Sequence, residues 1–285
     1  GSADIRIAVA FALRNFDLYK VNDTLYSLLR DRDIGVKLVA SSSLIYLGYE
    51  PEEFSPELIS IMQNGSISQA YRTMAARILA DMKEEMAFNS FLTVIGSLSE
   101  ADSELQEAII YGLGKLGKEE AVPYLSKTLL NLNTQQPTIV SLGEIKSPKA
   151  FETLEMFMEY LLELDPNSYN FQAYYLIITS LKQIDPLKTE KALLALLPKT
   201  KNVQFIQAAI LCLAESDNPT VKEFLFKSSR DANPEIFYVA INSLSSKVNE
   251  PKVKDLFIDV FKSNDDPAVK KTIILNLGGF DDLRV

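Results

Sequence analysis

The sequence contains no histidine and no tryptophan. Histidine is the commonest general base and the commonest metal ligand at neutral pH, so its absence excludes Ser-His-Asp catalysis, Cys-His catalysis and zinc sites of the HExxH type. Tryptophan is the best aromatic platform for a bound cation or a flipped base, and that platform is missing as well.

Only one cysteine, Cys212, is present, so the chain forms no internal disulfide. It stands among Ile210, Leu211 and Leu213. This setting predicts a buried thiol, because a nucleophilic thiol needs a nearby base that the sequence does not supply. Long apolar runs are also missing, since none reaches the roughly 18 residues that a membrane-spanning helix requires.

Positive charge is scarce, with 29 Lys and Arg against 38 Asp and Glu and a net charge of −9. Residues 1–181 carry 14 Lys and Arg and 24 Asp and Glu, whereas residues 182–285 carry 15 and 14. An acidic surface repels phosphate, which argues against nucleic acid as a partner and favours a basic or amphipathic one. The mildly basic stretch around residues 182–201 contains acids at 185 and 190 and predicts a surface loop.

Apolar residues make up 47% of the 285 residues, which is ample for a large core. The chain opens with Gly1-Ser2 and no methionine, which looks like the remnant of a cleaved expression tag, so residues 1–2 are set aside. A signal peptide or a further domain could have been removed with it. The compartment is therefore unknown, with a soluble chain expected and the cytoplasm favoured.

A helical pattern recurs along the whole chain, anchored on a leucine every 29 to 39 residues. The anchors are Leu13, Leu44, Leu79, Leu113, Leu142, Leu181, Leu213, Leu244 and Leu277. The residue directly before each anchor is usually small. Twelve positions after the anchor a large apolar residue usually follows, at Leu25, Phe91, Leu125, Leu154, Leu193, Leu225 and Leu256. In the second repeat the corresponding residue is Leu58, two positions further on. The unit is therefore a pair of helices, and stacked pairs share one continuous core.

Helix starts are marked by a capping residue followed by proline. The pattern occurs at Ser147-Pro148, Asp185-Pro186, Asn218-Pro219, Asn233-Pro234 and Asp266-Pro267. Proline suits the first helical position because its missing N–H would have no partner there.

The segment 112–117 fits G-x-G-x-x-G, the fingerprint of a dinucleotide-binding loop. That fingerprint needs a strand before it and a helix that begins within it, whereas here a helix runs through the glycines and stops. Gly117 is expected in the left-handed conformation just past the helix end, with a second helix following at Glu119 and Pro123 near its first turn. We therefore predict no nucleotide site; the glycines let one helix end and two helices approach.

The repeats resemble HEAT repeats, most closely the HEAT-like type of phycobilisome-lyase-related proteins. The resemblance rests on DxxVK at residues 33–37, DPAVKK at 266–271 and LGKLGKEEAVPYLSKTL at 113–129, and it extends over about the whole chain. It implies an all-α, right-handed α–α superhelix, a solenoid of about nine helix pairs with the last incomplete. A single domain is expected over 3–285, with repeats near 3–31, 32–65, 66–100, 101–132, 133–165, 166–200, 201–231, 232–264 and 265–285.

The segment 151–175 departs most from the average repeat, because it holds seven aromatic residues in the longest interval between anchors. On a helix, Phe151, Leu154, Met158 and Leu161 form a core stripe, with an acidic stripe beside it that has no lysine four positions on. These acids are a solvated face, or they form a groove with Met and aromatic residues for a basic amphipathic helix or an extended peptide. The candidate partner-binding residues are Glu152, Glu155, Met156, Glu159, Tyr160, Glu163, Tyr169 and Tyr174.

A second acidic cluster consists of Glu50, Glu52, Glu53 and Glu57. It lacks the spaced aspartates and the turn glycine of a calcium loop. Acids at a helix N-terminus are the expected role, because the helix dipole favours negative charge there.

For function, the resemblance implies a scaffold or adaptor that is not an enzyme, uses no cofactor or metal, and binds a protein or peptide on a concave face lined by the second helices. The alternative is an enzyme or enzyme accessory of bilin-lyase-like type that handles a hydrophobic small molecule. A third interpretation is structural, with the end at 277–285 stacking on another domain or chain. Two related activities are set aside: DNA glycosylases of this fold need a basic concave face, and diiron hydroxylases need histidine.

Overall fold

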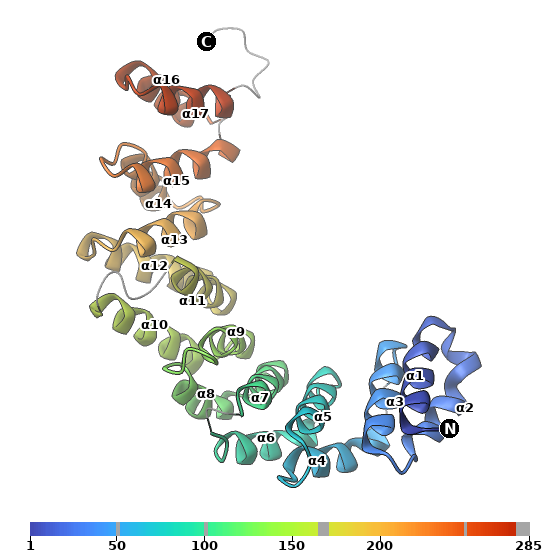
Figure 1. Ribbon diagram of the computed structural model, residues 1–285. Helices are drawn as coiled ribbons and strands as arrows, with labels where there is room; N and C mark the ends of the chain where they lie inside the picture. The colour runs from blue at the N-terminus through green and yellow to red at the C-terminus, as the bar shows by residue number, and fades with distance from the viewer. Residues whose placement is uncertain (50–51, 100–101, 165–170, 248–249, 278–285) are drawn as a thin grey trace. The chain divides into compact units, whose positions relative to one another are not determined.

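All regular structure in the described residues is helical (Figure 1). The structure, a computed structural model, describes residues 1–49, 52–99, 102–164, 171–247 and 250–277. Within these ranges no helix is both long enough and apolar enough to cross a membrane. The predicted all-α, HEAT-like solenoid is confirmed.

The helices follow one another in pairs, each made of a first and a second helix. The pairs are α1 (Ala3–Ala12) with α2 (Leu18–Leu29), α3 (Ile34–Tyr46) with α4 (Ser55–Gln63), α5 (Gln69–Asp81) with α6 (Phe88–Ile95), α7 (Ser103–Leu116) with α8 (Val122–Thr128), α9 (Gln135–Ile145) with α10 (Pro148–Glu163), α11 (Phe171–Ile184) with α12 (Pro186–Leu196), α13 (Val203–Leu213) with α14 (Pro219–Ser228), and α15 (Pro234–Leu244) with α16 (Pro251–Ser263). The final described helix is α17 (Pro267–Leu277).

The predicted helix starts are confirmed at all five capping residues followed by proline. Helices α10, α12, α14, α15 and α17 each begin at the proline. In α12 the carboxylate of Asp185 accepts a hydrogen bond from the Lys188 backbone N–H at 2.9 Å, which satisfies one of the N–H groups that the first turn leaves free.

Seven of the nine leucine anchors lie in the core, whereas Leu13 is half-buried and the side chain of Leu277 lies outside the description. Leu44, Leu79, Leu113, Leu142, Leu181 and Leu213 have no exposed surface, and Leu244 has almost none. The large residues that follow the anchors are buried as well, from Leu25 and Phe91 through to Leu256. Burying a side chain of this size contributes roughly 1.5–3 kcal/mol. The repeat pattern read from the sequence is therefore the pattern of core contacts.

The chain forms two compact units, residues 1–155 and residues 156–285, and the boundary between them falls inside α10. In the first unit α1, α3, α5, α7 and α9 pack directly against one another, and in the second unit α11, α13 and α15 do so. The second helices of successive pairs contact one another much less. The single domain over 3–285 stays a prediction.

Within the first unit, α3, α5, α7 and α9 lie on the inner side of the row and α4, α6 and α8 on the outer side (Figure 1). The expectation that the second helices line a concave face is therefore wrong for this unit. The physical reason is side-chain size: the small residue before each anchor lets first helices approach closely. Ser43 of α3 is an example, because its hydroxyl donates a hydrogen bond to the carbonyl of Ala10 in α1 at 2.8 Å.

Candidate functional site

Helix α10 carries most of the residues predicted to bind a partner. Its predicted core stripe, Phe151, Leu154, Met158 and Leu161, is buried. Of the predicted contact residues, Glu152, Met156, Glu159, Tyr160 and Glu163 are exposed and Glu155 is half-buried. Met156 exposes 69% of its surface. Glu152 and Glu155 belong to the first unit, and the other four belong to the second.

A shallow cleft of about 360 Å³ lies beside the C-terminal half of α10. It is lined by Glu159, Leu162 and Glu163 of α10 and by Leu196, Lys199 and Thr200 at the end of α12 and just beyond it. The four glutamates of α10 form no ion pair within the described part of the chain. The helix therefore presents glutamates without an ion pair next to exposed apolar side chains, with the Lys199 ammonium as the cation that lines the same cleft.

Tyr174 does not belong to this surface, because it is buried with 1% of its surface exposed. Its hydroxyl donates to the carbonyl of Leu161 at 3.2 Å and accepts from the side-chain amide of Asn202 at 3.1 Å. Its ring packs edge-to-face on Phe205 at 5.5 Å between centroids. Tyr174 thus links α10, α11 and the start of α13 as a core residue. The remaining candidate, Tyr169, lies outside the described residues.

The three glycines of the G-x-G-x-x-G segment have the structural roles that the sequence predicts. A Cβ atom on Gly112 would lie 2.7 Å from Cε2 of Phe91, and one on Gly114 would lie 2.8 Å from Cβ of Ser141. Gly117 caps α7 in the left-handed conformation, with φ of 66°. The helix runs through the segment from Ser103 to Leu116. No strand precedes the glycines in the described ranges, so the arrangement that cradles a pyrophosphate is missing.

Cys212 is buried with 5% of its surface exposed, as predicted. Burial raises the pKa of its thiol to about 11, with the nearby Lys182 ammonium acting weakly in the opposite direction. The thiol therefore stays protonated at neutral pH and is a poor nucleophile.

The second acidic cluster, Glu50, Glu52, Glu53 and Glu57, belongs to the stretch from the end of α3 to the first turn of α4. Within the described residues, no three His, Cys, Asp or Glu side chains are grouped so that they could hold a metal ion. Glu50 lies outside those residues. Glu57 forms an ion pair with Lys37 at 2.5 Å and so connects α4 to α3.

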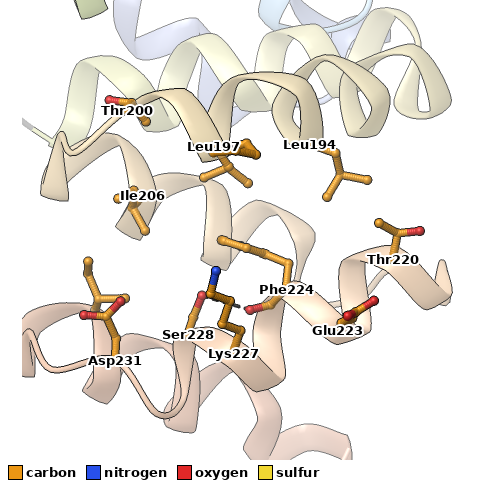
Figure 2. Close-up of a pocket in the computed structure, with 12 residues that line it drawn as sticks. Leu194, Leu197, Thr200, Ile206, Thr220, Glu223, Phe224, Lys227, Ser228 and Asp231 are labelled. Carbon is orange, nitrogen blue, oxygen red and sulfur yellow. Dashed lines mark hydrogen bonds between the residues drawn. The ribbon is translucent and has the colours of Figure 1, made fainter.

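The structure reveals a cleft of about 440 Å³ in the second unit that the sequence did not predict (Figure 2). Leu194 of α12 and Leu197, in the short turn that follows α12, form one wall, and Phe224 in the middle of α14 belongs to the other. First helices α13 and α15 contribute Ile206 and Ile236. This volume falls in the range of small-molecule sites, roughly 300–1,000 Å³, and the lining is mainly apolar.

Three charged residues accompany the apolar walls of this cleft: Glu223, Lys227 and Asp231. Figure 2 shows Lys227 extending from α14 toward Leu197 and Phe224. The hydroxyl of Ser228 is occupied, because it donates to the carbonyl of Phe224 at 2.9 Å. The residues that line the cleft can together bind and orient an apolar molecule. Lys227 offers its ammonium to an acidic substituent of that molecule.

The sequence contains one sign of this cleft, an additional large apolar residue beside a core position in two successive second helices. Phe224 and Leu194 stand directly beside the buried core residues Leu225 and Leu193. Since Leu193 and Leu225 already occupy the core positions, the additional large residue beside each can line a gap between repeats, and both Leu194 and Phe224 are half-buried.

Two family models match parts of the chain. A family model described as HEAT repeats matches residues 190–278, and one described as PBS lyase HEAT-like repeat matches residues 105–131. No curated protein matches the chain. Among solved structures, the complex of CpcE and CpcF of phycocyanin lyase from Nostoc sp. PCC7120 is similar, at 14% identity and a TM-score of 0.45, over 85% of this chain and 93% of that chain.

One expectation is corrected by these matches. We expected a chain that is not an enzyme, and the match over residues 105–131 overturns that expectation, because the repeat type found there takes its name from PBS lyase. The reason for the error is that the expectation followed the scaffold role that the resemblance to HEAT repeats implies, and no catalytic motif in the sequence argued against it.

Proposed function

Because the chain is a HEAT-like repeat protein with a repeat of the PBS lyase type, we propose that it is an enzyme or enzyme accessory of bilin-lyase-like type. In this proposal it holds a hydrophobic small molecule in the cleft between α12 and α14. The observation that carries the proposal is the cleft itself, with apolar walls, a volume of about 440 Å³ and a cation at its edge.

The lining residues have separate roles in this proposal. Leu194, Leu197 and Phe224 cover the apolar body of the ligand and remove it from water, which contributes roughly 25 cal/mol for each Å² of apolar surface buried. The groups in the cleft are suited to holding and orienting a molecule. The chain therefore acts by binding and presenting its ligand.

The test is a titration with biliverdin, a linear tetrapyrrole, followed by its visible absorbance and induced circular dichroism. Wild type is compared with Leu194→Asp, which places a charge in the cleft wall. The control is Leu187→Asp, which makes the same change on α12 at a side chain that is 79% exposed and lies outside the cleft. We expect the Leu194 variant to bind at least about tenfold more weakly, because one buried leucine contributes roughly 1.5–3 kcal/mol.

Far-ultraviolet circular dichroism of both variants checks that the helices are intact. Absence of biliverdin binding by wild type would reject the proposed function. Equal binding by both variants would place the ligand elsewhere and reject the cleft as its site.

A second proposal concerns a protein partner, which a lyase accessory needs if it presents its ligand to another chain. The exposed Met156 and Tyr160, beside Glu159 and Glu163, support a surface on the second-unit half of α10 for a basic amphipathic segment. Glu152 and Glu155 continue the same acidic stripe along α10 in the first unit.

A further inference from the structure

Arg14, in the short turn that follows α1, differs from the other half-buried arginines of the first unit. Arg6 pairs with the carboxylate of Asp31 at 2.6 Å, and Arg72 donates to the carbonyl of Met62 near the end of α4 at 2.8 Å. Within the described part of the chain, Arg14 forms no ion pair and no hydrogen bond to a carbonyl. A half-buried charge is costly to leave without a counter-charge, so this arginine calls for a negative partner.

Four side chains hold the guanidinium of Arg14 in place. Its Nε donates to the hydroxyl of Ser43 at 3.0 Å, and one Nη donates to the hydroxyl of Ser42 at 2.7 Å. The Ser43 hydroxyl is itself held, because it donates to a carbonyl of α1 at 2.8 Å. The Cζ atom of Arg14 lies 4.7 Å from the centroid of the Phe11 ring and 5.8 Å from that of the Tyr46 ring. A guanidinium fixed in this way loses little conformational entropy when it binds a ligand.

The fixed guanidinium keeps donors for a ligand. The second Nη group of Arg14 has no acceptor in the described residues, since the two serines take the Nε and the other Nη. The two rings beside it are exposed, Phe11 by 58% and Tyr46 by 69%. A cation with unused N–H groups therefore lies between two apolar surfaces that are open to solvent.

The charge at this place fits a carboxylate. A guanidinium presents paired N–H groups that match the two oxygens of a carboxylate. One cation balances one carboxylate, whereas a phosphate group brings a charge of about −1.5 to −2. The surplus charge of a phosphate would be repelled, because residues 1–181 carry 24 Asp and Glu against 14 Lys and Arg.

We infer that Arg14, Phe11 and Tyr46 form a docking surface for an acidic peptide segment of a partner protein. An Asp or Glu carboxylate of the partner accepts hydrogen bonds from Arg14, and a neighbouring apolar side chain of the partner lies on the two rings. Arginine and aromatic residues are the types that contribute most to protein interfaces. This surface belongs to the first unit and takes negative charge, so it is separate from the α12–α14 cleft and from the surface proposed on α10.

The experiment selects binders from a displayed library of random seven-residue peptides on wild type and on Arg14→Gln. Peptides that bind wild type and not the variant are synthesised with a fluorescent label, each beside an analogue in which Asn or Gln replaces its acid. Affinities are measured by fluorescence anisotropy. The control is Arg30→Gln, at an exposed arginine directly after α2 that forms no ion pair within the described residues.

We expect the selected peptides to carry Asp or Glu beside an apolar residue. Arg14→Gln should weaken their binding about tenfold, as for a hydrogen bond between charged groups. The amide analogue should lose a similar factor on wild type and nothing further on Arg14→Gln, because the two changes remove the same interaction. Arg30→Gln should bind as wild type does.

Two further variants cover a loss of folding in Arg14→Gln, which far-ultraviolet circular dichroism would detect. Arg14→Lys keeps the charge but not the paired N–H groups, and it should bind the acidic peptides several-fold more weakly. Tyr46→Ala removes a ring that is 69% exposed and should weaken binding by loss of apolar contact. No peptide that depends on Arg14, dependent peptides without an acid, or additive losses in the paired measurement would each overturn the inference.

Discussion

Side-chain size at helix crossings decides how closely this chain packs. The residue before each leucine anchor is usually small, and in the structure it stands where a first helix meets its neighbour. At Gly114 the neighbour is Ser141, whose Cα would lie 2.9 Å from an added Cβ. That contact involves backbone, so it cannot be relieved by rotating a side chain, and α7 and α9 would have to separate.

Replacing Gly114 with alanine is therefore expected to lower the free energy of unfolding by about 1–3 kcal/mol through overpacking. The control is Gly65→Ala, because a Cβ at Gly65 meets nothing within 4 Å. Alanine there should leave stability unchanged or raise it by about 0.4–1 kcal/mol. Urea unfolding followed by circular dichroism measures both, and equal stabilities would contradict the close helix contact.

Tyr174 illustrates what residue patterns alone do not reveal. Its place in an aromatic-rich segment led us to predict an exposed contact residue. The structure buries it because Asn202, 28 residues away, supplies a hydrogen-bond partner for its hydroxyl. A tyrosine can be buried when its hydroxyl finds such a partner, and no local pattern shows whether one will be present.

At the scale of elements, α10 shows both the strength and the limit of helical periodicity. The core stripe of α10 was predicted correctly, because apolar residues three and four apart must share a face. Periodicity also separated the glutamates from that stripe. It did not tell a solvated face from a docking surface, since both consist of exposed polar residues.

The docking proposal for α10 is tested with a labelled helical peptide that has a leucine face and a lysine face. Glu159→Lys/Glu163→Lys should weaken its binding about tenfold at low salt, and added salt should reduce the difference, because exposed charges are screened. The control is the reversal of another exposed pair, Glu119→Lys/Glu120→Lys. Fluorescence anisotropy measures affinity, and equal binding by both variants would remove α10 as the site.

At the scale of the whole molecule, each helix pair contacts mainly the pairs before and after it. In such an array, stability is approximately a sum of terms within repeats and between neighbouring repeats. A local defect should therefore stay local, in contrast to a globular domain with one shared core.

We expect Leu213→Ala to show this behaviour. Leu213 of α13 has no exposed surface, and removing most of its side chain should cost about 2–5 kcal/mol. Hydrogen exchange should rise in α13 and in its neighbours α11 and α15 and remain unchanged in α3 and α5. Leu211→Ala, at a residue of the same helix that is 41% exposed, is the control. Faster exchange throughout the chain would contradict independent repeats.

The sequence by itself determined the helix pairs, the buried leucine anchors, the five proline starts and the role of the glycines, because each depends on residues within one or two helical turns or on a pattern repeated along the chain. The tertiary structure decided which row of helices lies on the inner side of the first unit, that Tyr174 is buried, and that a cleft with Lys227 at its edge opens between α12 and α14. These features arise where residues of successive repeats meet, about 30 positions apart, and their distances depend on how closely neighbouring helices pack.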